Sequence, residues 1–296
     1  MTDLAALRSR LEWGLVPAVP VPYKEGQLAA EAQQAYARWM AGQPVAGVAV
    51  WAHTGRGPHL SATDRRRVLA AWRAALPDKL VVAGANSIEM AREARAGGAD
   101  LALAFPRRDD PAGYHRELSR ELPVIAFYLY EAAGGVAYDD VTLHAILSLD
   151  RVIGIKVATL DSVVTYQRVA RVMRDHPGKL LITGEDRFLG YSFMTGARAA
   201  LIGMGAAVTD LQAELVRAFA AQRLGDFLRL TSVTDALGAA IFAAPVDGYV
   251  RRLLWALAEE GVIPGDACDD PWGPALDSAE RELVRRAVRD ARATRR

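Results

Sequence analysis

Residues 152–158 read Val-Ile-Gly-Ile-Lys-Val-Ala, an apolar and largely β-branched run that contains a single charge, Lys156. Such a run is typical of a strand covered on both faces in a parallel sheet. Lys156 is one of only four lysines in the chain, and burying its ammonium group costs the hydration of the charge. Burial also lowers the pKa of an amine, and a neutral amine attacks carbonyl carbons. We therefore interpret the run as a buried strand with a candidate Schiff-base nucleophile; the alternative is a lysine that reaches solvent from a strand edge.

Similar short apolar runs recur along three quarters of the chain. We expect eight strands, at 16–22, 47–53, 80–85, 101–105, 123–130, 152–158, 180–184 and 199–204. Segments of helical period alternate with them, near 29–42, 61–76, 88–97, 112–121, 139–149, 160–175, 187–196 and 208–222. Eight repeats of this unit predict an α/β fold, a (β/α)8 TIM barrel. An open doubly wound sheet is the alternative, but no G-x-G-x-x-G motif follows the first strand.

The last quarter of the chain has helical patterning only. The expected helices lie near 224–242, 246–260 and 277–293, and a linker rich in proline, glycine and aspartate precedes the last of them. We interpret residues 1–223 as the catalytic barrel domain. Residues 224–296 are then a C-terminal α-helical extension packed on the barrel.

Composition limits the classes of function. The chain has 296 residues, a net charge of +1 and a single cysteine, Cys268. The charge gives no strong attraction to nucleic acid or membranes, and one cysteine argues against a disulfide framework or a cysteine metal site. We find no signal-peptide core and no apolar run of about 18 residues. We therefore expect a cytoplasmic enzyme without a metal, a cofactor, or a nucleic-acid or membrane partner.

Polar residues at the expected strand ends are the candidates for the site, because barrel enzymes place their chemistry there. The strand next to that of Lys156 contains Tyr128, whose phenol is suited to shuttling protons during imine formation, although a lone strand tyrosine is by default a core residue. The second strand ends in His53-Thr54-Gly55. A hydroxyl and backbone N–H groups in such a loop suit the binding of a carboxylate, although the default interpretation is a turn.

Together these residues resemble the dihydrodipicolinate synthase / N-acetylneuraminate lyase family of Schiff-base-forming enzymes. The strand ending at Lys156 matches the family's I-x-G-I-K, and a separation of 28 residues selects Tyr128 rather than Tyr130 as the family's tyrosine. The Thr54-Gly55 pair matches the family's T-G loop. Further matches are Gly184-Glu185-Asp186 at strand 7, Leu201-Ile202-Gly203 at strand 8, and Phe242 to Val246 before a C-terminal helix.

The resemblance implies a set of site residues. Four are expected to be catalytic: Lys156, Tyr128, Thr54 and His53. Six are expected to bind substrate: Thr54, Gly55, Gly184, Ile202, Arg107 and Arg108. Lys156 would attack the C2 carbonyl, Tyr128 would shuttle protons and Thr54 would help to hold the C1 carboxylate.

Three departures from the family pattern indicate a different substrate. His53 stands where the family has threonine or serine in a proton relay, and histidine can itself relay protons near neutral pH. Arg107 and Arg108 occupy a loop that often has two tyrosines in the family. Ala133 occupies the position where dihydrodipicolinate synthases have an arginine for a second carboxylate, so we do not expect that reaction here.

These observations predict a Schiff-base lyase that acts on pyruvate or a pyruvate-derived 2-oxo acid by aldol cleavage or condensation. One alternative is a hydro-lyase, a dehydratase of a sugar-derived 2-keto-3-deoxy acid on the same scaffold. A second alternative is a non-catalytic family member. The resemblance also implies a homo-oligomer, a dimer or a tetramer.

Overall fold

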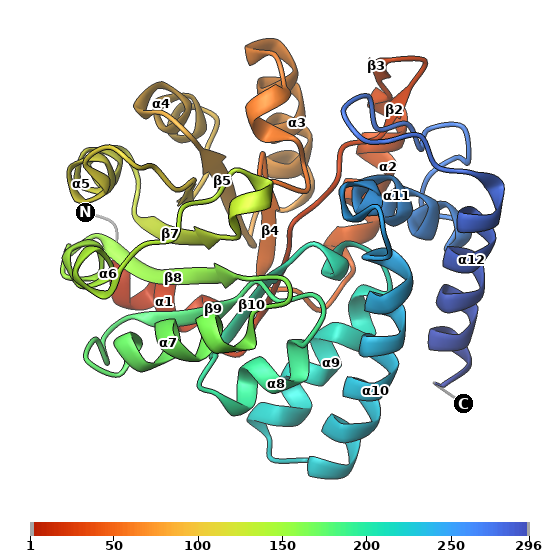
Figure 1. The fold of residues 1–296 in the computed structure, drawn as a ribbon. Coiled ribbons are helices and arrows are strands. Elements are labelled where there is room, and N and C mark those ends of the chain that lie inside the picture. Colours follow the sequence, from red (N-terminus) through yellow and green to blue (C-terminus); the bar gives the residue numbers. More distant parts are fainter. Residues whose placement is uncertain (1–2, 295–296) are drawn as a thin grey trace.

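A barrel of eight parallel strands forms the centre of the computed structural model, which describes residues 3–294 (Figure 1). In sheet order the strands are β1 (Leu15–Pro17), β10 (Ala199–Ile202), β9 (Leu180–Thr183), β8 (Val152–Ala158), β7 (Val124–Leu129), β6 (Leu101–Ala104), β5 (Leu80–Ala85) and β4 (Gly47–Val50). Just beyond β1 the barrel closes, since Ala18 forms a parallel bridge to Ala49 and the N–H group of Val19 donates to the Ala49 oxygen at 3.0 Å.

Helices connect the strands and cover the outside of the barrel (Figure 1). They are α2 (Ala30–Ala41), α3 (Ala62–Ala75), α4 (Ile88–Ala96), α5 (Pro111–Glu121), α6 (Asp140–Leu147), α7 (Val163–Met173), α8 (Leu189–Met194) and α9 (Thr209–Ala220). Several begin where the sequence provides an N-cap: the side chains of Ser61, Ser87 and Asp139 each accept a hydrogen bond from a backbone N–H in the first turn. The predicted (β/α)8 barrel is thus confirmed.

Two apolar layers explain why the strands are apolar on both faces. Alternate side chains such as Val82, Phe127 and Ile182 pack together inside the barrel, whereas their neighbours pack against the helices. The helix α1 (Leu4–Leu11), which the sequence patterning did not predict, adds Leu7 and Leu11 to the inner layer. Because these leucines pack with the first residues of the strands, α1 covers the N-terminal end of the barrel.

Three C-terminal helices lie on one side of the barrel: α10 (Leu224–Ile241), α11 (Tyr249–Glu259) and α12 (Ser278–Ala293) (Figure 1). Helix α10 packs on α8 and α9, and both α10 and α11 contact α12. The connection from α11 to α12 reaches the small hairpin β2 (Tyr23–Lys24) and β3 (Gln27–Leu28) through a bridge between Tyr23 and Asp269. The boundary at residue 223 between a barrel domain and an extension stays a prediction.

An ion pair fixes the same connection to the loop after β4. The guanidinium of Arg56 lies 2.6 Å from the Asp270 carboxylate, and both side chains are almost fully buried. Arg56 also donates to the backbone oxygen of Asp247 at 3.2 Å, just before α11, so the start of α11 is held next to the loop after β4. Within residues 3–294 no single helix has the length and apolarity needed to cross a membrane, and only α10 together with residues 246–259 passes that test as a bent pair.

Candidate active site

A small cavity of about 30 Å³ lies at the C-terminal ends of the barrel strands. It has room for about two water molecules, so side chains at its mouth must move when a larger ligand binds. Residues from β4, β7, β8, β9, β10 and α11, or from the loops next to them, surround it. They are His53, Thr54, Phe127, Leu129, Tyr130, Lys156, Ala158, Leu160, Gly184, Glu185, Asp186, Gly203, Phe242 and Tyr249.

Lys156 points into this cavity from β8 and is only 5% exposed. It is in register with Phe127 of β7, and its Nζ atom lies 4.3 Å from the centroid of the Phe127 ring. Burial lowers the pKa of the Lys156 amine to about 8, although the charges of Asp186 and Glu185 act to raise it. A useful fraction of the amine is therefore neutral near pH 7 and able to attack a carbonyl carbon.

Gly184 leaves space for the lysine where β9 ends. A Cβ atom on Gly184 would lie 2.6 Å from Cε of Lys156 and 2.9 Å from the backbone oxygen of Val157. Real Cβ contacts are longer than both distances, so any larger residue would displace the amine or the strand. Gly184, expected among the substrate-binding residues, thus lines the cavity and leaves room for the Lys156 side chain.

A chain of hydrogen bonds joins the loop after β4 to α11. The Tyr249 phenol donates to Oγ1 of Thr54 over 3.3 Å and lies 2.8 Å from Nδ1 of His53. Burial, then the charges of Arg56 and Lys156, lower the pKa of His53 to about 4, and burial raises the pKa of Tyr249. At neutral pH the three side chains are therefore uncharged. Proton transfer along these hydrogen bonds can exchange the donor and the acceptor of each bond.

Two adjacent acids differ in their contacts. Glu185 accepts hydrogen bonds from the backbone N–H groups of Thr159 and Leu160 at 2.6 and 3.1 Å, so it holds the loop after β8. Asp186 accepts from the N–H group of Met204 at 2.6 Å. Burial raises the pKa of Glu185 to about 8 and that of Asp186 to about 6, although the nearby Lys156 charge acts to lower the latter.

Tyr128 does not face Lys156, contrary to the prediction. Its side chain lies outside the barrel, where the Arg168 guanidinium donates to the phenol at 3.1 Å and Tyr138 packs edge-on. The reason is strand geometry: successive side chains point to opposite faces, and Phe127 shares the inner face with Lys156. Tyr130, which the spacing to Lys156 had not selected as the family's tyrosine, lines the cavity instead. Burial raises the pKa of its phenol to about 12.

The arginine pair after β6 also lies outside the cavity. The Arg107 guanidinium sits 5.6 Å from the centroid of the Tyr114 ring. Arg108 is exposed and forms a 3.4 Å ion pair with Glu131. Both belong to the loop between β6 and α5, and neither lines the cavity; a contact of either arginine with substrate stays a prediction.

Two smaller residues that were expected to bind substrate, Ile202 and Gly55, do not line the cavity, whereas their chain neighbours do. Ile202 packs outward into the helical layer, and the next residue, Gly203, lines the cavity. A Cβ atom on Gly203 would lie 2.9 Å from Oγ1 of Thr54. Gly55 is buried behind the loop after β4, where a Cβ atom would meet the backbone oxygen of Val19 at 2.9 Å, so its neighbours His53 and Thr54 line the cavity instead.

Two aromatic residues of the site come from the C-terminal region and were not predicted. Phe242 follows α10, Tyr249 begins α11, and their rings stack with centroids 4.9 Å apart. The available signal was the family-like segment from Phe242 to Val246, which ends three residues before Tyr249. Only the docking of the C-terminal helices on the barrel shows that these rings reach Thr54 and His53.

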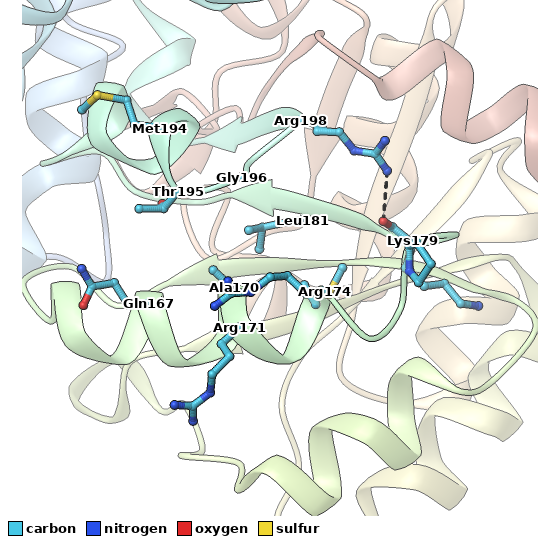
Figure 2. A pocket seen from close by; sticks show the side chains of 12 residues that line it. Gln167, Ala170, Arg171, Arg174, Lys179, Leu181, Met194, Thr195, Gly196 and Arg198 are labelled. Atoms are coloured by element: carbon cyan, nitrogen blue, oxygen red, sulfur yellow. Dashed lines mark hydrogen bonds between the residues drawn. The ribbon is translucent and has the colours of Figure 1, made fainter.

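A larger hollow of about 780 Å³ lies between α7 and α8, near the start of β9 (Figure 2). Lys179 lines it, but its ammonium donates to the backbone oxygens of Leu149 and Val152 at 2.8 and 2.7 Å. Arg198 donates to the backbone oxygen of Lys179 at 3.3 Å (Figure 2). These cations hold loops together rather than face a reactant. Among residues 3–294 no cluster of three or more histidine, cysteine or acidic side chains is placed to hold a metal ion.

Comparison with known proteins identifies the family. The profile of the dihydrodipicolinate synthetase family matches residues 12–290. The chain belongs to the dihydrodipicolinate synthetase family. Two relatives within it are 4-hydroxy-tetrahydrodipicolinate synthases: that of Ruegeria pomeroyi is 28% identical over 90% of this chain and 97% of its own, and that of Anaeromyxobacter sp. is 29% identical over 74% and 77%.

Solved structures show that the dihydrodipicolinate synthetase family fold extends over the whole chain. The sialic acid aldolase of Ruminococcus gnavus, solved as a catalytic lysine mutant, superposes with a TM-score of 0.84 at 20% identity, covering 100% of this chain and 99% of its own. The N-acetylneuraminate lyase of Mycoplasma synoviae gives 0.77 at 19% identity, with 96% and 98% covered. As a member of the family, the chain is an enzyme of the class I, Schiff-base lyase type.

Proposed function

We propose that this enzyme binds pyruvate, or a longer 2-oxo acid derived from it, as an imine on Lys156 and forms or cleaves a carbon–carbon bond. The observation on which this rests is the buried amine of Lys156, with its pKa lowered to about 8, in a cavity lined by hydroxyl groups. The protonated imine withdraws electrons from C3 and stabilises an enamine there. That enamine is the common intermediate of aldol addition and cleavage.

Hydroxyl groups around the lysine support the proton transfers. Imine formation needs one group that protonates the carbinolamine oxygen and lets it leave as water. We assign this role to Tyr130 instead of Tyr128, because Tyr130 lines the cavity and its raised pKa keeps the phenol protonated. Thr54 and the N–H groups of its loop are positioned for the C1 carboxylate, with Tyr249 and His53 as proton donors and acceptors behind it.

The reaction named for the synthase relatives is not the one we propose. Their reaction, as the sequence resemblance implies, uses an arginine five residues after the strand-5 tyrosine for a second carboxylate. That position is Ala133 counted from Tyr128 and Gly135 counted from Tyr130, so neither count gives an arginine. Among the described residues that line the cavity there is no arginine either. Loss of water from an intact carbon chain would use the same lysine, and analysis of the products of a 2-keto-3-deoxy acid separates dehydration from cleavage into pyruvate and an aldehyde.

Borohydride trapping tests the proposed chemistry. With pyruvate and sodium borohydride, we expect one reduced adduct per chain, located by peptide mass spectrometry at Lys156. Lys156→Ala should give none. Lys179→Ala is the matched control, since Lys179 is a half-buried lysine next to a barrel strand and donates only to backbone oxygens. The proposal would be refuted if Lys156→Ala still formed the adduct. It would also be refuted if the native protein formed no adduct.

Two further features stay proposals. We propose a homo-oligomer, a dimer or a tetramer, which light scattering coupled to size-exclusion chromatography tests. We propose a cytoplasmic location, which fractionation of cells tests. A second copy of the chain is also one possible source of groups that complete the mouth of the cavity, and a dilution series of activity against concentration would show such a dependence.

A further inference from the structure

Apolar side chains form a large part of the cavity wall. Leu129 ends β7, Leu160 follows β8, and Phe242 comes from the end of α10. Phe127 and Ala158 also line the cavity. A substrate held by Lys156 at its C2 atom, with its carboxylate next to Thr54 as proposed above, would place the rest of its carbon chain against these apolar side chains.

Leu160 is held in a conformation that leucine rarely adopts. Its φ angle is +64°, in the left-handed region where glycine is the usual residue. The Glu185 carboxylate fixes it, since it accepts the N–H groups of both Thr159 and Leu160 and also the Thr159 hydroxyl at 3.0 Å. Strained residues persist where the surrounding structure imposes them, often at ligand sites. Here the strain places an apolar side chain at the cavity.

The cavity offers no free cation to a second anionic group. Among the described residues that line it, Lys156 is the only cation, and the proposed reaction uses it as the nucleophile. Arg56, the nearest arginine of the β4 loop, is bound to the carboxylate of Asp270 through two nitrogen atoms and to the backbone oxygen of Asp247. Asp186 adds a carboxylate to the wall. A second anion would thus be buried beside a like charge without a partner.

From these contacts we propose that the second substrate, or the fragment released on cleavage, is an uncharged aldehyde with an apolar alkyl or aryl substituent that packs on Leu129, Leu160 and Phe242. This inference rests on the proposed Schiff-base function. In the addition direction, C3 of the enamine forms a bond to the aldehyde carbon. The electron pair of the aldehyde C=O moves to its oxygen, which takes a proton from a cavity phenol. One water molecule then hydrolyses the imine, releasing a 4-hydroxy-2-oxo acid and the free lysine.

Three aldehydes of similar length test the substrate class. Pentanal is uncharged and apolar, 4-oxobutanoate has a carboxylate in place of the alkyl end, and glyceraldehyde has hydroxyl groups. Each is incubated with the enzyme and pyruvate, and the 4-hydroxy-2-oxo acid is quantified by mass spectrometry to give kcat/KM for the aldehyde. We expect pentanal to exceed 4-oxobutanoate by about 100-fold or more, since the charged end would lose its hydration without gaining a partner.

A substitution of Leu160 tests the proposed wall itself. Leu160→Gly keeps the left-handed backbone and the hydrogen bonds to Glu185 but removes the side chain. We expect the ratio of kcat/KM for pentanal over glyceraldehyde to fall by about 10-fold. The matched control is Gln222→Gly, because Gln222 is exposed, has a φ of +57° and does not line the cavity. The control should relieve similar strain without changing the ratio.

Borohydride trapping in the same preparations separates two kinds of failure. If pyruvate is trapped on Lys156 but 4-oxobutanoate reacts as fast as pentanal, or no aldehyde reacts, the inference about the apolar aldehyde is overturned and the lysine chemistry stands. An unchanged ratio in Leu160→Gly also overturns it. If pyruvate is not trapped at all, the proposed function fails and the inference fails with it.

Discussion

Removal of the Asp186 charge should shift the pH dependence of imine formation in a defined direction. The pKa of Lys156 is about 8 because burial lowers it, and Asp186 opposes that effect. With that pKa, about a tenth of the amines are neutral at pH 7, against about 0.03% for an unperturbed lysine. The enzyme therefore has about 300-fold more nucleophile at pH 7 than a solvated lysine would provide. Asp186→Asn removes a stabilising negative charge, so the apparent pKa should fall below that of the native enzyme.

The size of the effect depends on pH. The pKa of Asp186 is raised to about 6, so its charge is present above that pH and is lost as the pH falls through it. Asp186→Asn should therefore accelerate the attack on pyruvate most between pH 6 and 8 and change little below pH 6. The assay is the second-order rate constant of trapping with cyanoborohydride at low pyruvate, measured from pH 5 to 10, since this constant reports the pKa of the free enzyme.

The control for this experiment is Asp78→Asn, which removes an exposed carboxylate from the loop before β5. Its pH profile should match that of the native enzyme. An apparent pKa near 10.5 in the native enzyme would refute the argument that burial lowers the pKa of the Lys156 amine. A pKa that rises in Asp186→Asn would refute the proposed electrostatic coupling between the two side chains.

Three further substitutions, with Tyr128→Phe as a control, test the geometry of the site. Gly184→Ala places a Cβ atom 2.6 Å from Cε of Lys156; a displacement of about 1 Å should slow trapping about 100-fold. Tyr130→Phe should slow the same step by about 100-fold or more, whereas Tyr128→Phe, outside the barrel, should change it less than about 3-fold; equal effects would contradict the assignment. Tyr249→Phe should lower kcat about 10-fold or more while the protein stays folded by circular dichroism, and normal turnover would exclude the relay.

The barrel could be predicted from sequence because each strand is a buried apolar run and each helix has a polar face. Those patterns reflect which side chains are buried within each element. The alternation of strands and helices could therefore be predicted without knowing which elements contact one another. Lys156 was visible for the same reason, as the one charge in a fully apolar strand. Helix α1 was missed because it is only eight residues long, about two turns, which is too short to reveal a helical period.

The tyrosine could not be assigned from spacing alone. Residues 128 and 130 have the same parity in a strand, so alternation predicts the same face for both side chains. The structure distinguishes them because β7 ends at Leu129, and Tyr130 lies where the chain leaves the strand. A count of 28 residues to the lysine contains no information on where the strand ends.

The rest of the site could not be predicted because it is formed by contacts between elements that are far apart in the sequence. Tyr249 is 195 residues from Thr54 in sequence, yet their hydroxyl oxygens lie 3.3 Å apart. The arginines after β6 were assigned to substrate because their loop often has two tyrosines in the family, whereas in the structure Arg107 lies over the Tyr114 ring of α5. Such contacts depend on how separate elements meet, and no local pattern encodes them.

A crystal soaked with pyruvate would test the proposed chemistry most directly. We predict continuous electron density from Nζ of Lys156 to C2 of the ligand, with the C1 carboxylate next to Thr54 and the methyl carbon directed toward Leu160. Pyruvate bound without a covalent link to Lys156, or bound only in the hollow between α7 and α8, would contradict the assignment of this lysine as the nucleophile.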